Sequence, residues 1–75
     1  IGLAPVPATE ILTVTMGAPG GSVVLIDPQG RAMMTQRLVV GANDMDVRHF
    51  ARGMFIIEVR DARGGVLHRS PILLQ

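Results

Sequence analysis

Apolar and polar residues alternate along several short stretches of the chain, a pattern typical of half-buried β-strands. In Ile11–Met16, the apolar Leu12, Val14 and Met16 alternate with two threonines, which predicts one buried and one exposed face. The next stretch, Ser22–Asp27, is apolar on both faces and is therefore expected to be a central strand.

The strongest strand pattern covers Met54–Asp61. We expect Glu58 and Arg60 to point outward, and the alternate positions to point into a core: Phe55, Ile57 and Val59. A last strand is predicted in Val66–Gln75, where Pro71 indicates an edge strand or a bulge.

Turn signals separate these stretches. Asp27–Gly30 has proline second and glycine fourth, as in a type I turn, and predicts a hairpin to a third strand in Arg31–Arg37. That third strand could alternate in either register. We expect a loop at Gly41–Asn43 and then a short strand in Asp44–Val47, with its two carboxylates on one face.

Two further segments complete the chain. The stretch "RHFARG" suits a single turn closed by Gly53, which is expected to adopt a positive φ. Residues 1–10 contain Pro5 and Pro7 and form an extended lead-in that can lie along a sheet edge without pairing fully.

These elements predict an all-β protein, a small antiparallel β-sandwich. They amount to six or seven short strands, spaced roughly 8 to 12 residues apart with turns between them. A length of 75 residues predicts a single domain over residues 1–75 with one modest core. Because the chain starts without Met, we expect it to be a piece of a longer protein.

Composition excludes several classes of function. There is no cysteine, which rules out disulfides and thiolate metal sites. All seven basic residues are arginines spread along the chain, the net charge is +1, and Phe50 and Phe55 are the only aromatic residues. This argues against nucleic-acid binding. No run approaches the about 20 apolar residues of a membrane span, and the first residues lack the basic lead of a signal peptide.

The residue types that could carry chemistry are scattered. His49 and His68 lie on different predicted elements without a third metal ligand, and Asp44 and Asp46 lack the dense oxygen ligands of a calcium loop. Neither Ser22 nor Ser70 lies in a nucleophile elbow. Arg52, near Phe50, could bind an anion or be solvated. We therefore expect no catalytic residues, no metal, no cofactor and no enzymatic activity.

The apolar surface exceeds what one face of each sheet requires. Val24, Ile56 and the run Ile72–Leu74 place apolar residues on the second face of their strands. Such a face is either packed in the core or used for recognition. The closing strand is the edge to which a partner would add a strand, and edge strands could also form a homodimer.

Four segments in order resemble the carboxyl-terminal sorting domain (type A) of type IX secretion proteins in Bacteroidetes. Leu3–Val14 is similar to the family's opening motif, in which a Pro-Asn-Pro-Ala-like run precedes a Leu-x-Val strand. Gly20–Leu38 is similar to the middle motif, which consists of a strand, an Asp-x-x-Gly-Arg turn and a second strand. Gly41–Asp61 resembles the segment that begins with Gly-x-Asn and an alternating strand and continues with a short turn and a Gly-Met/Val-Tyr strand. Val66–Gln75 lies where the family has its closing strand. Val6 replaces the usual Asn, Phe55 the usual Tyr, and His68-Arg69 a Lys-rich segment.

The resemblance implies an immunoglobulin-like sandwich of about seven strands that acts as an address label. It would direct a folded cargo from the periplasm through the outer-membrane translocon to the cell surface. A surface sortase of the attachment complex would then remove the domain and join the cargo to anionic lipopolysaccharide. The recognition residues that the resemblance implies are Gly30, Arg31, Gly53, Met54, Phe55, Val66, Leu67, His68, Arg69, Ile72, Leu73, Leu74 and Gln75.

Two other functions stay open. The domain could be a retained part of the secretion machinery that binds the sortase or lipopolysaccharide, an alternative suggested by the departure at Val6. It could also be a structural or carbohydrate-binding module of a secreted enzyme, although two phenylalanines with no Trp or Tyr offer a poor platform for sugar rings.

Overall fold

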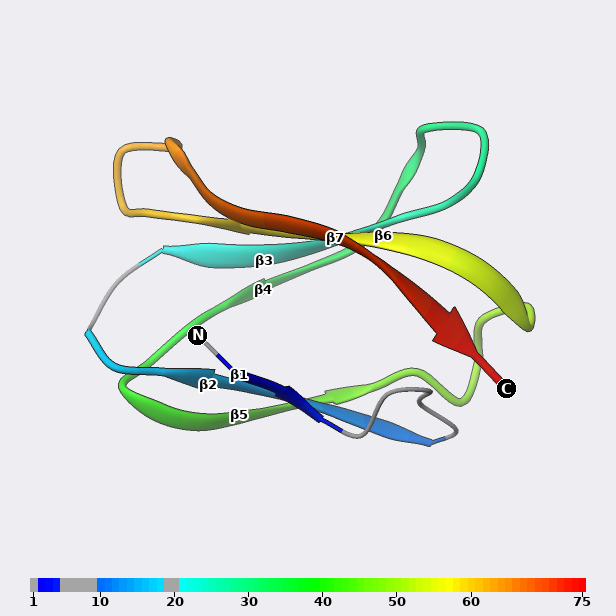
Figure 1. The fold of residues 1–75 in the computed structure, drawn as a ribbon, viewed down its shortest axis with the longest axis horizontal. Coiled ribbons are helices and arrows are strands. Elements are labelled where there is room, and N and C mark those ends of the chain that lie inside the picture. Colours follow the sequence, from blue (N-terminus) through cyan, green and yellow to red (C-terminus); the bar gives the residue numbers. More distant parts are fainter. Residues whose placement is uncertain (1, 5–9, 19–20) are drawn as a thin grey trace.

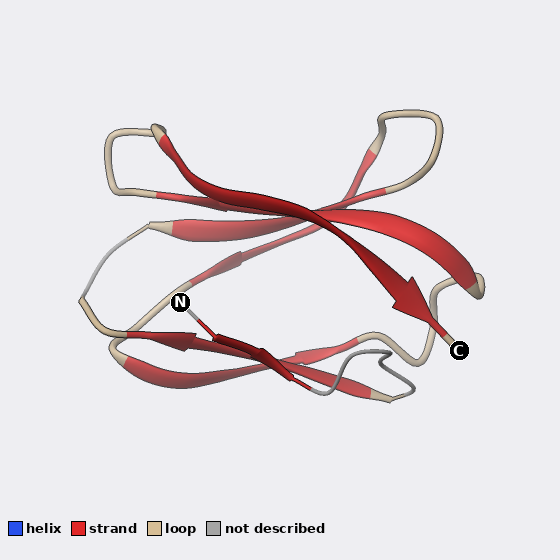
Figure 2. Ribbon diagram, in the orientation of Figure 1, coloured by secondary structure: helices blue, strands red, loops and turns tan. Residues whose placement is uncertain are grey.

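The computed structural model describes residues 2–4, 10–18 and 21–75, which form seven β-strands and no helix (Figures 1 and 2). This confirms the predicted all-β class. Within the described ranges, therefore, no apolar helix of membrane-spanning length occurs. The strands are β1 (Gly2–Ala4), β2 (Ile11–Met16), β3 (Ser22–Ile26), β4 (Ala32–Arg37), β5 (Gly41–Asp46), β6 (Gly53–Arg60) and β7 (Val66–Leu74).

The strands form two antiparallel sheets that lie face to face (Figure 1). One sheet has three strands in the order β1-β2-β5, and the other has four in the order β4-β3-β6-β7. The chain changes sheet between β2 and β3, between β4 and β5 and between β5 and β6. The result is the predicted immunoglobulin-like sandwich, in a form where β4 pairs with β3 rather than with β5.

The core lies between the sheets and is almost entirely aliphatic, as predicted. The residues expected to point inward from β2 and β6 are all buried. The ring of Phe55 lies 6.5 Å from that of Phe50, centroid to centroid, where the loop before β6 closes one end of the core. The core comprises Leu12, Val14, Met16, Val23, Leu25, Leu38, Met45, Val47, Phe55, Ile57, Val59, Ile72 and Leu74.

The central and edge positions follow from the sequence pattern. The strand β3, apolar on both faces, lies between β4 and β6 as predicted. The edge strand β4 begins at Ala32. The structure shows which of its two possible registers occurs, because Met34 lies opposite Leu25 and Gln36 lies opposite Val23. Of the lead-in, Gly2–Ala4 pair along the edge of β2, and Pro5 and Pro7 lie outside the described residues.

The loop predicted at Gly41–Asn43 is wrong, because these residues are the first half of β5. Every residue from Gly41 to Asp46 pairs with a residue of β2, so the ladder extends through a segment whose composition resembles a turn. Asn43 is buried and stabilises the connection from β4. Its amide nitrogen lies 3.0 Å from the Val14 carbonyl oxygen and 2.9 Å from that of Val39, and its Oδ1 accepts from the Val39 N–H at 2.8 Å.

Candidate recognition surface

A hairpin with an ion-paired turn joins β3 to β4. The Gly30 N–H donates to the Asp27 carbonyl oxygen at 2.9 Å, and Gly30 has a φ of +87°, so the type I turn predicted at Asp27–Gly30 is confirmed. The Asp27 Oδ1 accepts the backbone N–H groups of Gln29 and Arg31, and its Oδ2 lies 2.8 Å from Arg31 Nε. This arrangement fixes Gly30 and Arg31, two residues of the implied recognition set, at one tip of the four-stranded sheet.

The hairpin between β6 and β7 uses the same turn. Asp61 Oδ1 accepts the N–H groups of Arg63 and Gly65, and the Gly64 N–H donates to the Asp61 carbonyl oxygen at 3.0 Å. The equivalence of this turn to the first one was not predicted from the sequence. The signal in the sequence is the spacing Asp-x-x-Gly, which occurs at both places.

Each hairpin continues into a β-bulge that adds an apolar residue to the sheet. On β4, Ala32 pairs with Ile26 and Met34 with Leu25, so Met33 is the extra residue. On β7, Val66 pairs with Arg60 and His68 with Val59, so Leu67 is the extra residue. A bulge places two residues opposite one. Met33 and Leu67 are accordingly 43% and 53% exposed.

A charged band crosses the outer face of the four-stranded sheet between these apolar ends. Glu58 points outward, as predicted, but its side chain is only 6% exposed because two arginines cover it. Arg60 lies 2.6 Å from its Oε1 and Arg69 3.6 Å from its Oε2, and these two arginine side chains are 43% and 62% exposed. The face therefore presents guanidinium groups and hides the carboxylate.

The arginines also set the protonation of two carboxylates. The backbone N–H of Arg31, together with its guanidinium, holds the pKa of Asp27 below its ordinary value despite burial. On the other sheet, hydrogen bonds from the Arg48 guanidinium, at 2.7 and 3.0 Å, hold the pKa of Asp46 well below its ordinary value. Both groups therefore stay ionised under mildly acidic conditions.

The closing strand β7 is an edge strand, bonded to β6 on one side only in the part of the chain that the structure describes. Pro71 lies on this edge, as predicted, and pairs with Ile56. Ile72 and Leu74 point into the core, and Leu73 lies half-buried on the outer face. The strand is thus fixed by its inward residues while its edge and outer face remain exposed.

Arg52 links the loop before β6 to Gln75, the residue that follows β7. Its guanidinium donates to the backbone carbonyl oxygens of Val47 at 2.6 Å, Phe50 at 2.7 Å and Gln75 at 3.2 Å. Arg52, considered above as an anion ligand or a solvated residue, is instead engaged with backbone carbonyl groups. This contact fixes the position of Gln75.

The three implied residues at the start of β6 differ in their environments. Gly53 has a φ of +129°, which confirms the predicted positive φ. Met54 is 52% exposed on the outer face, whereas Phe55 is buried in the core. Like Ile72 and Leu74, Phe55 can therefore contribute to recognition in the folded state only by supporting its neighbours.

Among the described residues, the side chains with catalytic potential lie apart from one another, except for one pair on β7. His68 Nε2 and Ser70 Oγ lie 3.0 Å apart on β7, and among the described residues no carboxylate bonds to this histidine. Asp44 accepts the Thr13 hydroxyl at 2.8 Å. No group of three metal-ligating side chains occurs in the described ranges.

A hollow at the opposite end of the sheet from Met33 is lined in part by Arg37, Arg60 and Asp61. Arg60 is already bonded to Glu58, and Asp61 to the backbone of its turn. Both charged side chains are thus held by contacts within the chain, and the hollow offers a surface for binding.

Comparison with known proteins identifies the family of the chain. The model of the family described as "Secretion system C-terminal sorting domain" matches residues 3–72, nearly the whole chain. Searches of curated proteins and of solved structures found no match.

Proposed function

Because the chain belongs to the family of secretion system C-terminal sorting domains, we propose that it carries an attached, folded cargo from the periplasm through the type IX outer-membrane translocon. Membership of this family identifies a type IX sorting signal and implies secretion through the outer membrane and interaction with the secretion system. The observation that carries the proposal is the family match over residues 3–72, together with the two-sheet sandwich of the structure.

The form of the β7 edge supports a signal that is read as a folded surface. Its inward residues Ile72 and Leu74 are each 1% exposed, and Arg52 fixes the adjacent Gln75. The edge is therefore held in one conformation without a disulfide. An ordered edge can accept a partner strand without first paying the entropy cost of folding.

We further propose that a surface sortase removes the domain after translocation and joins the cargo to anionic lipopolysaccharide. On this proposal the domain itself would perform no chemistry. Mass spectrometry of the mature surface protein tests this step. Loss of all peptides from residues 1–75 is expected, and a retained β6–β7 peptide would contradict removal.

The main test is whether the chain is sufficient for secretion. A folded fluorescent reporter, exported to the periplasm of a host with type IX machinery, is fused to residues 1–75. The fusion is expected to become sensitive to protease added to intact cells, while the reporter without the domain stays protected. Protection of both proteins would overturn the proposed function.

A further inference from the structure

The outer faces of the two sheets differ in chemistry. On the three-stranded sheet, the outward pairs between β2 and β5 are Ile11 with Asp46, Thr13 with Asp44 and Thr15 with Ala42, and apart from Ile11 these residues are polar or small. The four-stranded sheet instead carries an apolar cluster, the outer patch, at the end near the β3–β4 turn. The outer patch consists of Ile26, Met33, Met54, Ile56, Pro71 and Leu73.

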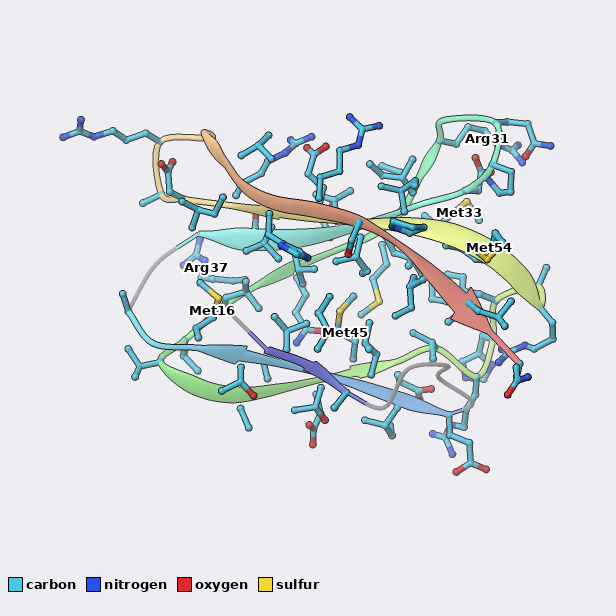
Figure 3. All side chains as sticks on the ribbon, in the orientation of Figure 1. Met16, Arg31, Met33, Arg37, Met45 and Met54 are labelled. Atoms are coloured by element: carbon cyan, nitrogen blue, oxygen red, sulfur yellow. The ribbon has the colours of Figure 1, made fainter. Side chains whose placement is uncertain are left out.

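The outer patch spans the full width of its sheet. Ile26, Ile56 and Pro71 pair across three neighbouring strands, and Met54 pairs with Leu73 in the next row. Figure 3 shows Met33 and Met54 on the outer side, at the end of the sheet that carries Arg31, whereas Met16 and Met45 lie between the sheets. Since the inward faces already fill the core, the outer patch is not required to complete it.

The exposure of the patch indicates binding. Met33 and Met54 are 43% and 52% exposed, while Ile26, Ile56 and Leu73 are half-buried. A contiguous apolar patch with a polar border is the usual form of a protein interaction site. Methionine is flexible and polarizable, and it adapts to partners of different shape.

The charges around the patch indicate the chemistry of its partner. Arg31 borders it at one tip, and Arg60 and Arg69 lie in the band beside it. Their side chains are 43% to 72% exposed, whereas the carboxylates of Asp27 and Glu58 beneath them are each 6% exposed. A partner therefore meets apolar side chains first and guanidinium groups at the border, and carboxylates on the partner would complement them.

We propose that the outer patch is the docking site for a protein of the secretion machinery whose surface has an apolar centre and carboxylates at its edge. A protein fits better than a lipid surface, because the headgroup level of a membrane favours the amphipathic rings of Trp and Tyr. The chain has none of these residues, and its two phenylalanines contact each other away from the patch.

The inference rests on the proposed function and adds to it the face that the secretion machinery contacts. It is distinct from the β7 edge, since the patch draws residues from all four strands of its sheet. Edge pairing and face docking can occur together, because the edge uses backbone groups and the face uses side chains.

The test uses the reporter fusion with two pairs of substitutions. Met33→Glu with Met54→Glu places carboxylates in the outer patch. The matched control, Ala4→Glu with Ala42→Glu, places them at exposed positions of the other sheet, on strands that do not pair with each other. Each glutamate removes apolar contact area and adds a charge at the docking face, so the first pair is expected to lower surface display at least about tenfold. The control pair is expected to leave display near that of the unchanged fusion.

A conservative pair separates docking from folding. Met33→Leu with Met54→Leu keeps the patch apolar and is expected to restore display, and the melting temperatures of the purified domains check that all variants fold. If the unchanged fusion is displayed and the glutamate pair is displayed equally well, the inference is wrong and the proposed function stands. If the unchanged fusion is not displayed, both are wrong.

Crosslinking identifies the partner class. A photo-crosslinking residue at position 33 or 54 is expected to give an adduct with an outer-membrane protein, and one at position 15 or 42 is not. An adduct with lipopolysaccharide alone, or equal adducts from both faces, would overturn the inference.

Discussion

At the scale of single residues, a few side chains hold segments that the hydrophobic pattern alone does not fix. Asn43 joins the start of β5 to the Val39 backbone and to β2, and Arg52 joins the loop before β6 to Gln75 through carbonyl oxygens. Both are polar residues whose role depends on contacts distant in the sequence. No local pattern predicts such contacts, which explains why Arg52 was considered as an anion ligand.

Gly53 gives a prediction about backbone conformation. Its φ of +129° is a region that residues with a Cβ rarely adopt, although an added Cβ would meet no atom within 4 Å. Gly53→Ala is therefore expected to lower the free energy of unfolding by about 1–3 kcal/mol through backbone strain alone. Urea denaturation of the purified domain measures this value.

The matched control is Gly17→Ala, because Gly17 also has open space around it and no positive φ. Its effect is expected to stay within about 0.5 kcal/mol. Equal losses for the two variants would show that the φ of Gly53 does not limit the choice of residue.

At the scale of elements, both hairpins of the four-stranded sheet combine an aspartate turn with a bulge, and so place Met33 and Leu67 on the surface. The strands themselves were predictable where alternation is long, as in Ile11–Met16 and the strand from Gly53 to Arg60. The bulges were not predictable from the sequence, because a bulge shifts the alternation of inward and outward side chains by one residue. For β4, the hydrophobic pattern is therefore compatible with either register. The start of β5 was missed because pairing with β2 outweighs the turn-like composition of its first residues.

The β3–β4 turn gives a prediction about pH. The pKa of Asp27 is lower in the folded state than the about 3.9 of an unfolded chain, so its contribution to stability is complete above about pH 4. It is lost as the pH falls through the folded-state pKa. Asp27→Asn keeps the Oδ1 acceptor and removes the charge. The variant should therefore melt below the wild type at neutral pH, and the difference should narrow as the pH falls below about 4.

Gln29→Ala, in the same turn, changes no ionisable group and serves as the control. Its difference in melting temperature from the wild type is expected to stay constant between neutral and acidic pH. A difference for Asp27→Asn that is equally constant would contradict the assignment of charge-dependent stability to this turn.

At the scale of the whole molecule, the sandwich presents two surfaces that its core does not require: the β7 edge and the outer patch. The fold class and the family were predictable, because strand and turn patterns follow one another in a recognisable order along the entire chain. The separation of the implied recognition residues into buried and exposed groups was not predictable. It depends on which face of β6 and β7 packs against the other sheet, and it places Phe55, Ile72 and Leu74 in the core.

The most direct measurement of the central claim is surface display of the reporter with and without the closing strand. Display is read as protease sensitivity of the reporter on intact cells, for fusions to residues 1–75 and to residues 1–65. Removal of Val66–Gln75 eliminates the β7 edge and two core residues, so the shortened fusion is expected to remain protected in the periplasm. Display of the shortened fusion at the level of the full domain would contradict the claim that this folded edge is the sorting signal.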